Sequence, residues 1–271
     1  MMAVVVEQEV CGFPRLAWYE GENHSWDVFW AGLEPDDLVS HVVARPGLLS
    51  LFRRHLPKGG RVLDAGCGLG QWVIVLRQLG YNVHGVDTNE YVVGKLKERL
   101  PDARVELGDV SDLHYPEGYF SAYYSLGVLD HIEEGPQAAL REAHRVLSLD
   151  GVLICAVTHF NLVRRFRPRV QQPLPNHHFY HWAFLAREVQ KMLNAAGFRV
   201  VERRPYNVMK TLTDEFGLVK KAAGAYGPKQ KAMSERRPSR AWWNLLNTHV
   251  LESSLLRHFG GNMIAFVARK K

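Results

Sequence analysis

Short apolar runs alternate with amphipathic segments through the middle of the chain, between residues 61 and 158. The runs RVLDA, YNVHGVD and ARVELGD are expected to form buried strands. Residues 71–79 and 90–100 carry apolar side chains at helical spacing and are expected to form helices between those strands. Strands that alternate with helices in this way predict an α/β fold with a doubly wound parallel sheet.

The alternation continues towards the C-terminus. FSAYYS and VLICAV are predicted strands that flank a helix over 136–147. The amphipathic stretch FLAREVQKMLNAAG then predicts another helix, followed by a strand, and MIAFVARK is the predicted last strand.

Three glycines follow the first predicted strand directly. Gly66, Gly68 and Gly70 separate that strand from the helix that begins near Gln71. Glycine permits unusual backbone angles and lets a ligand approach where a Cβ would clash. A strand, a glycine turn and a helix N-terminus are the parts of a nucleotide-binding unit, although the same turn also occurs in βα connections that bind nothing.

Carboxylates end three successive predicted strands. Asp64, Asp87 and Asp109 occupy these positions, and Asp87 lies roughly 20 residues beyond the glycine turn, where a carboxylate can accept hydrogen bonds from ribose hydroxyls. The carboxyl ends of parallel strands line one crevice of an open sheet. An acidic crevice suits a cationic nucleoside better than a pyrophosphate.

Taken together, these motifs resemble those of class I S-adenosylmethionine-dependent methyltransferases. VLDAGCGLG resembles the first motif of that family, GVD its acidic ribose motif and GDV its adenine-contacting motif, and SLGVLDHIEE and LSLDGVLIC resemble its later segments. The resemblance is close over 61–158 and looser over 184–201. It implies a Rossmann-like sheet of seven strands with the last antiparallel, helices on both faces, and cap insertions. It also implies S-adenosylmethionine as cofactor and S-adenosylhomocysteine as product.

The resemblance also assigns cofactor contacts. Asp64 would contact the amino group of the cofactor, Asp87 the ribose, and Asp109 with Val110 the adenine. The whole expected set is Tyr19, Asp64, Gly66, Cys67, Gly68, Gln71, Asp87, Thr88, Gly108, Asp109, Val110, Ser125, Leu126 and Gly127.

The remaining segments are expected to serve the acceptor. Residues 1–60 are predicted to form a helical, aromatic lid, in which Tyr19, Trp26 or Trp30 stacks on the cofactor or simply belongs to the core. Residues 61–207 and 260–271 would form the methyltransferase core. Two substrate-side insertions are predicted, over 159–183 and 208–259, and the second contains a basic, tryptophan-bearing segment that could contact a membrane or a partner.

Candidate catalytic residues lie after the fourth strand and in the first insertion. His131 is predicted to open the helix after that strand, where it would act as general base or merely orient the loop. His178 and Tyr180 are further candidates for a share in proton removal. The arginines of the first insertion, from Arg164 to Arg169, could bind phosphate or form a solvated basic loop. No metal is expected, because His177, His178 and His181 lack nearby cysteine or carboxylate ligands.

Charge is distributed unevenly along the 271 residues. Residues 1–159 carry a net charge of −9 and residues 160–271 a net charge of +15, which favours a phosphorylated substrate, a lipid surface, nucleic acid or a solvated basic face. The three cysteines are scattered, which favours a reducing compartment, and no apolar run is long enough to span a bilayer. We therefore expect a cytoplasmic protein, with peripheral membrane contact as an alternative, and the sequence leaves its oligomeric state undetermined.

The leading hypothesis is a methyltransferase that acts on a small-molecule or lipid-linked acceptor, at oxygen. An RNA methyltransferase is an alternative, but the sequence lacks a recognisable RNA-binding module and an N/D-PPY-like motif, so no nucleic-acid partner is expected. A non-catalytic module that binds S-adenosylmethionine is another alternative, which cofactor affinity without turnover would favour. A nicotinamide oxidoreductase fits the strand-end carboxylates less well.

Overall fold

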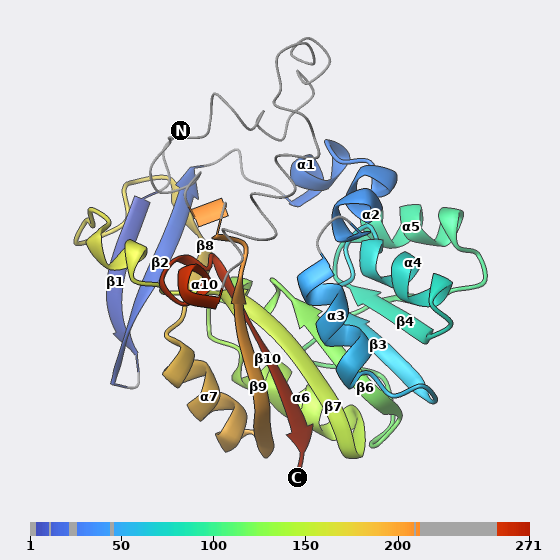
Figure 1. Ribbon diagram of the computed structural model, residues 1–271. Helices are drawn as coiled ribbons and strands as arrows, with labels where there is room; N and C mark the ends of the chain where they lie inside the picture. The colour runs from blue at the N-terminus through green and yellow to red at the C-terminus, as the bar shows by residue number, and fades with distance from the viewer. Residues whose placement is uncertain (1–3, 11, 22–25, 44–45, 209, 212–253) are drawn as a thin grey trace.

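The computed structural model describes residues 4–10, 12–21, 26–43, 46–208, 210–211 and 254–271 of the chain (Figure 1). Most of the predicted second insertion, with its tryptophan-bearing segment, lies outside the described residues, as does Cys11.

A seven-stranded sheet with the order β5-β4-β3-β6-β7-β10-β9 forms the centre of the molecule. Its strands are β3 (Arg61–Ala65), β4 (Asn82–Asp87), β5 (Arg104–Leu107), β6 (Phe120–Leu126), β7 (Leu147–Thr158), β9 (Phe198–Tyr206) and β10 (Met263–Lys270). The strands from β5 to β7 pair in parallel, whereas β10 pairs antiparallel with both β7 and β9. The predicted Rossmann-like sheet with an antiparallel last strand is therefore confirmed.

Helices cover both faces of this sheet and bury two separate apolar clusters. One cluster contains Leu140 and Val146 of α6 and Val189 and Leu193 of α7, which pack against one face of β6, β7 and β10. The other cluster joins Phe52 of α3 and Leu76 of α4 to the opposite face. The described helices of the chain are α1 (Trp26–Ala31), α2 (Pro35–Val43), α3 (Pro46–His55), α4 (Gln71–Gln78), α5 (Glu90–Arg99), α6 (Gln137–Val146), α7 (Ala186–Ala195) and α10 (Ser254–Gly260).

A second, three-stranded antiparallel sheet stands beside the main one (Figure 1). It consists of β1 (Val4–Val10), β2 (Phe13–Gly21) and β8 (His177–Ala183), with β2 in the middle. The structure thus differs from the helical N-terminal segment and the irregular first insertion expected from the sequence. The reason is pairing between distant segments, because Leu16 lies opposite Ala183 and Trp18 opposite His181.

A buried ion pair joins the small sheet to the main domain. Arg15 of β2 pairs with Glu188 of α7, and both side chains are almost fully buried. The Arg15 guanidinium also lies over the rings of Trp182 and Phe184, with its central carbon 5.4 and 4.9 Å from their centroids. These contacts desolvate the pair, so removal of either partner would leave a buried charge without compensation.

His159 directly follows β7, at the point where the chain leaves the main sheet. Its backbone N–H donates to the carbonyl oxygen of Asn262 at 2.9 Å, and burial lowers the pKa of its imidazole to about 4. The unfolded chain, with a histidine pKa of about 6.5, binds more protons between these values. Stability is therefore present above about pH 6.5 and is lost as the pH falls towards 4.

Urea unfolding measures this effect. We expect the contribution of His159 to the free energy of unfolding to be about 2–3 kcal/mol smaller at pH 4.5 than at pH 7. His159→Gln should show a smaller loss over the same interval, because its side chain does not titrate. His114→Gln, at an exposed position, is the matched control and should behave as the wild type. An identical pH dependence in wild type and His159→Gln would contradict this assignment.

Candidate cofactor-binding and methyl-transfer site

The glycine loop after β3 is fixed to the end of β4. The backbone N–H groups of Gly66 and Cys67 both donate to the carbonyl oxygen of Val86, at 2.8 and 3.0 Å. Gly66 has a φ of 83°, and a Cβ on it would lie 2.3 Å from a methyl carbon of Val128, so a larger residue would be strained and would clash. The amides hold the loop in place, and its carbonyl oxygens are the groups suited to an ammonium ligand.

Asp64 is a buried carboxylate at the end of β3. The residue is 4% exposed, and burial raises the pKa of its carboxyl well above the usual value. The nearby hydroxyl of Tyr124 opposes this shift, whereas the charge of Asp87 adds to it. A cationic ligand group beside Asp64 would stabilise its ionised form, as the acidic strand ends predict.

Asp87 ties the end of β4 to the glycine loop. Its Oδ2 accepts a hydrogen bond from the Gly68 N–H at 2.8 Å, and its Oδ1 accepts one from the Asn89 N–H at 3.0 Å. Burial raises the pKa of Asp87, and these hydrogen bonds oppose the shift. Each carboxylate oxygen can accept more than one hydrogen bond, so the predicted ribose contact remains compatible with this role. Thr88 beside it is exposed.

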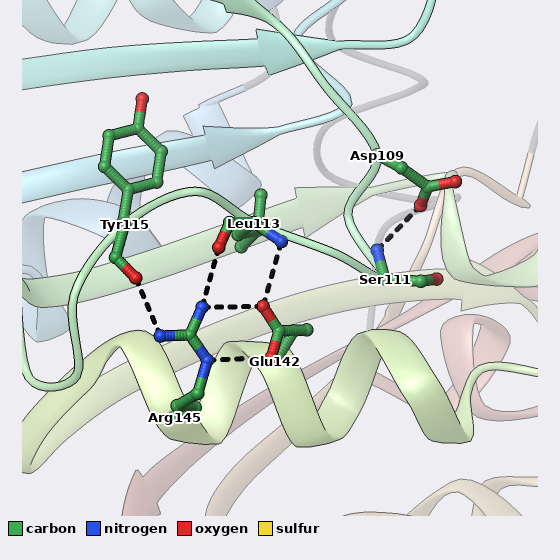
Figure 2. Close-up of polar contacts among 6 residues, drawn as sticks. All are labelled: Asp109, Ser111, Leu113, Tyr115, Glu142 and Arg145. Atoms are coloured by element: carbon green, nitrogen blue, oxygen red, sulfur yellow. Dashed lines mark hydrogen bonds and ion pairs between the residues drawn. The ribbon is translucent and has the colours of Figure 1, made fainter.

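The predicted adenine loop follows β5 and is fastened to α6 (Figure 2). Asp109 is exposed and accepts a hydrogen bond from the Ser111 N–H at 2.7 Å, while Val110 is buried and the Gly108 N–H donates to the Asp87 carbonyl oxygen at 3.0 Å. The fold therefore brings the Gly108–Val110 segment against the end of β4, where the second carboxylate lies.

Glu142 and Arg145 of α6 hold the rest of that loop. The Glu142 carboxylate accepts from the Leu113 N–H at 2.9 Å, and Arg145 donates to the carbonyl oxygens of Leu113 and Tyr115, each at 2.7 Å. The two side chains are also joined to each other by hydrogen bonds of 2.7 and 2.8 Å (Figure 2). Sequence reasoning missed both residues, and an acidic and a basic residue three positions apart on a helix was the only available signal.

Two buried polar atoms near the predicted cofactor segments lack a hydrogen-bond partner within the described structure. They are Oε1 of Gln71, at the first turn of α4, and Oγ of Ser125, at the end of β6. The next residues, Leu126 and Gly127, are half-buried, and the Gly127 N–H donates to the Ala156 carbonyl oxygen at 2.8 Å. Buried polar groups are costly without partners, so these atoms are suited to contacts with a polar ligand.

His131 ends a short 3-10 turn, η1 (Leu129–His131), which follows β6. It does not open the next helix as expected, because α6 begins only at Gln137. The preceding Asp130 is fully buried, and its Oδ2 accepts hydrogen bonds from the N–H and the hydroxyl of Thr158, at 3.0 and 2.6 Å. This pair of bonds fixes the turn to the end of β7 and thereby positions His131.

The structure brings together two of the three candidate catalytic residues. The imidazole of His131 lies 5.0 Å from the ring of Tyr180 between centroids, and its Nδ1 is 2.6 Å from the Tyr180 carbonyl oxygen. His178 is instead exposed on β8, opposite Glu20 of β2, and is not part of this group. His181 stacks on Trp18, and burial lowers the pKa of its imidazole well below the usual value.

Helix α1 lies between the glycine loop and His131. An atom of the Trp30 ring lies 2.6 Å from the position that a Cβ on Gly68 would take, so only glycine accommodates this contact. Trp26 meets the His131 ring edge-on at 4.8 Å, and Asp27 accepts a hydrogen bond from the Asn89 amide at 2.6 Å. Trp30 therefore occupies the place expected of a lid aromatic, whereas Tyr19 packs against Phe179 in the small sheet.

The described residues contain neither a candidate metal site nor a candidate membrane-spanning helix. There, no group of three or more histidine, cysteine, aspartate or glutamate side chains is arranged to hold a metal ion. In the same part of the chain, no helix is both long and apolar enough to cross a bilayer.

Comparison with known proteins agrees with this geometry. The methyltransferase domain family matches residues 63–155. An uncharacterized methyltransferase of Synechocystis is 29% identical over 167 residues, which cover 58% of this chain and 76% of that protein. A demethylmenaquinone methyltransferase of Geobacillus stearothermophilus is 29% identical over 194 residues, with 57% of this chain and 82% of that protein covered.

A solved S-adenosylmethionine-dependent methyltransferase from Mesorhizobium loti has the same fold. It superposes with a TM-score of 0.53 at 17% identity, over 84% of this chain and 98% of that one. The sheet order is that of a Rossmann-like fold, in which the carboxyl ends of the parallel strands are the usual place for a nucleotide or nucleoside ligand. With the family match over residues 63–155, the chain contains a methyltransferase domain of the class I S-adenosylmethionine-dependent type, and S-adenosylmethionine is its cofactor.

The residues present fit this cofactor. Buried Asp64 offers a negative charge to an ammonium group, the end of β4 offers Asp87 to the ribose, and the unpartnered Oγ of Ser125 and Oε1 of Gln71 offer further polar contacts. The bound cofactor supplies an activated methyl group and its own leaving group, so the protein has to position the acceptor and manage its proton.

Asp64→Asn should separate stability from cofactor binding. Because burial disfavours the ionised carboxylate, the neutral amide is expected to stabilise the ligand-free protein at pH 7 by roughly 1 kcal/mol, or about 3 °C in Tm. Affinity for S-adenosylmethionine should fall by about tenfold or more, because the charge that faces the ammonium group is lost. Calorimetric titration and thermal unfolding measure the two effects, and unchanged affinity would remove Asp64 from the site.

Arg145→Gln should loosen the adenine loop without touching the cofactor. We expect about tenfold weaker binding of S-adenosylmethionine, because two hydrogen bonds to the loop carbonyls are lost. Arg141→Gln, one turn earlier and exposed on the same helix, is the control and should bind as the wild type. Equal affinities of the two variants, measured by calorimetry, would show that the contacts to Leu113 and Tyr115 do not set the loop geometry for binding.

Proposed function

We propose that this methyltransferase transfers the methyl group to an oxygen atom of a small-molecule or lipid-linked acceptor, with His131 as the general base. The observation that carries the proposal is the short contact between His131 Nδ1 and the Tyr180 carbonyl oxygen, 2.6 Å. A carbonyl oxygen only accepts hydrogen bonds, so this contact requires the proton of a neutral imidazole to be on Nδ1. Nε2 then carries the lone pair and is able to accept a proton.

Both sides of the His131 turn support this role. Asp130 and Thr158 fix the turn from the β7 side, and Tyr180 fixes the imidazole from the small sheet. A general base must be held within hydrogen-bond reach of the proton that it removes, and two independent anchors reduce the freedom of the ring. Trp26 of α1 covers the ring edge-on and helps to exclude water from that side.

The proposed reaction is an in-line displacement at the methyl carbon. The acceptor hydroxyl loses its proton to His131 Nε2 as its oxygen forms a bond to the methyl carbon. The bound cofactor would supply the methyl carbon together with its own leaving group, a neutral sulfide that keeps the electron pair of the carbon–sulfur bond, so His131 would have only the acceptor proton to remove. The transferred proton then leaves His131 for solvent, which restores the base.

Aromatic and basic side chains support the choice of acceptor. Rings of Trp26, Tyr180 and His181 gather around His131, and aromatic faces suit a planar or apolar acceptor group. The demethylmenaquinone methyltransferase similar to this chain acts on a quinone-type molecule, as its name states. A lipid-linked ring with a hydroxyl group is therefore the first acceptor class that we would test.

The decisive variant is His131→Asn, whose amide N–H can still donate to the Tyr180 carbonyl but cannot act as a base. We expect kcat to fall by a factor of about 10²–10⁴, with S-adenosylmethionine affinity unchanged. The measurement is methyl transfer to a panel of phenols, hydroquinones and lipid-linked hydroxyl compounds, with the methylated atom identified by NMR.

His178→Asn is the matched control, because His178 lies on the same strand as Tyr180 but is exposed and outside the ring group. It should keep wild-type kcat. Full activity of His131→Asn would exclude His131 as the base, and products methylated only at carbon or nitrogen would overturn the oxygen assignment.

A further inference from the structure

We propose that an exposed apolar patch formed by η2 and α10 binds the surface of an anionic lipid bilayer. This patch, called the Phe166 surface below, consists of Leu162, Phe166, Leu256 and Phe259. The inference rests on the lipid-linked part of the proposed function, because it explains how an acceptor that stays in a membrane would reach the site.

The four side chains are unusually exposed for large apolar residues. Phe166 is 82% exposed, Phe259 is 50%, Leu162 is 43% and Leu256 is 39%. Single exposed apolar residues are common on protein surfaces, but several from neighbouring elements mark an interaction site. Phe166 ends the 3-10 turn η2 (Val163–Phe166), and Leu256 and Phe259 belong to α10.

Hydrogen bonds join these two elements. The Leu162 N–H donates to the Phe259 carbonyl oxygen at 3.2 Å. Asn161, which precedes the turn, is buried and donates through its amide to the Gly261 carbonyl oxygen at 3.0 Å. The segment before η2 and the segment that follows α10 are therefore held together as one local unit.

Arg164 anchors the turn from inside. It is only 3% exposed, and it donates to the carbonyl oxygens of His159 and Asn262 at 2.7 and 3.1 Å. It is therefore a structural residue, whereas the sequence left both phosphate binding and a solvated basic loop open for the arginines of this insertion. Because Arg164 points inward, Phe166 two residues later is presented outward by a turn whose base is fixed.

The charges around the Phe166 surface are positive. Arg165 and Arg167 flank Phe166 in sequence, whereas Arg257 of α10 has its Nε and Nη1 atoms buried. Neither 159–183 nor 254–271 contains an aspartate or glutamate. Glu7 of β1 faces this region, where it pairs with Arg169, and Arg167 lies over the Trp18 ring. Exposed aromatic and aliphatic side chains among cations match the interface of an anionic bilayer.

The chain links this patch to the proposed base through the end of β7. β7 ends at Thr158, which binds Asp130 beside the proposed base, and the chain continues from there through Asn161 into η2. A bilayer that contacts Phe166 would therefore lie against the same edge of the main sheet as His131. A lipid-linked acceptor could then expose its reactive group to the site while its tail stays in the membrane.

The test is co-sedimentation of the full chain with vesicles of phosphatidylcholine alone, or of phosphatidylcholine with phosphatidylglycerol. We expect binding to the anionic vesicles that weakens with added salt, and little binding to the neutral ones. Phe166→Ser and Phe259→Ser should each weaken binding by about tenfold, because an aromatic ring no longer enters the apolar layer. Arg165→Gln should weaken it by about fivefold.

Leu149→Ser is the matched control, because Leu149 is 76% exposed but lies near the opposite end of β7, so its vesicle binding should equal that of the wild type. Circular dichroism checks that every variant is folded. Failure of the wild type to bind anionic vesicles would overturn the proposal, as would equal binding by Phe166→Ser, or equal losses in Leu149→Ser. A wild-type dimer in ultracentrifugation that Phe166→Ser converts to a monomer would also overturn it, by assigning the patch to a second copy of the chain.

Methyl transfer to a short-chain, water-soluble hydroquinone separates this inference from the proposed function. If the Phe166 surface serves membrane docking, Phe166→Ser should keep wild-type kcat on that acceptor and lose activity only on a vesicle-embedded one. Vesicle binding without methylation at oxygen would refute the proposed reaction and leave the docking surface in place. Methylation of both acceptors at oxygen without vesicle binding would support the proposed reaction and refute the docking surface.

Discussion

The hydrogen bonds between the glycine loop and the end of β4 set the geometry of the site. Gly66 and Cys67 donate to the Val86 carbonyl oxygen, and Gly68 donates to the Asp87 carboxylate. These bonds align the ends of β3 and β4. Asp64 is buried at the end of β3, and Asp87 at the end of β4 accepts a hydrogen bond from the loop. Because parallel strands place their carboxyl ends at one edge, the adenine loop after β5 joins the same crevice. Any shift of the loop would therefore move several cofactor contacts together.

The central fold was predictable from local patterns. The inner strands β3, β4, β6 and β7 are short, mainly apolar runs between amphipathic segments, as burial on both faces requires, whereas the edge strand β5 buries only Val105. The carboxylates at the strand ends were visible in the same way, because the position of Asp64 or Asp87 follows from where its strand stops. The glycines added the loop between them, since Gly66 and Gly68 accept conformations and contacts that a Cβ would prevent.

Features that depend on distant pairing were not predictable. The small sheet joins Leu16 to Ala183 and Trp18 to His181, and neither partner carries a local sign of the other. The same limit explains why Trp30, rather than Tyr19, meets the glycine loop, and why Tyr180 orients His131 through its backbone rather than its hydroxyl. Glu142 and Arg145 were missed because an ion pair on a helix surface has the same pattern whether or not a loop binds it. Every residue has a backbone carbonyl group, so the sequence does not show which one accepts a hydrogen bond from a side chain.

The small sheet affects the order in which parts of the protein unfold. β2 and β8 are separated by more than 150 residues in the chain, so their pairing has to close a long loop, whereas the βα units of the main sheet form from local contacts. The side of the site that holds Tyr180 and His181 is then a late-folding and early-opening unit, whereas the glycine loop belongs to the local βα core. Partial unfolding of this kind would first remove the support of His131 and leave the cofactor crevice intact. Cofactor retention alone would then overstate how much working enzyme a preparation contains.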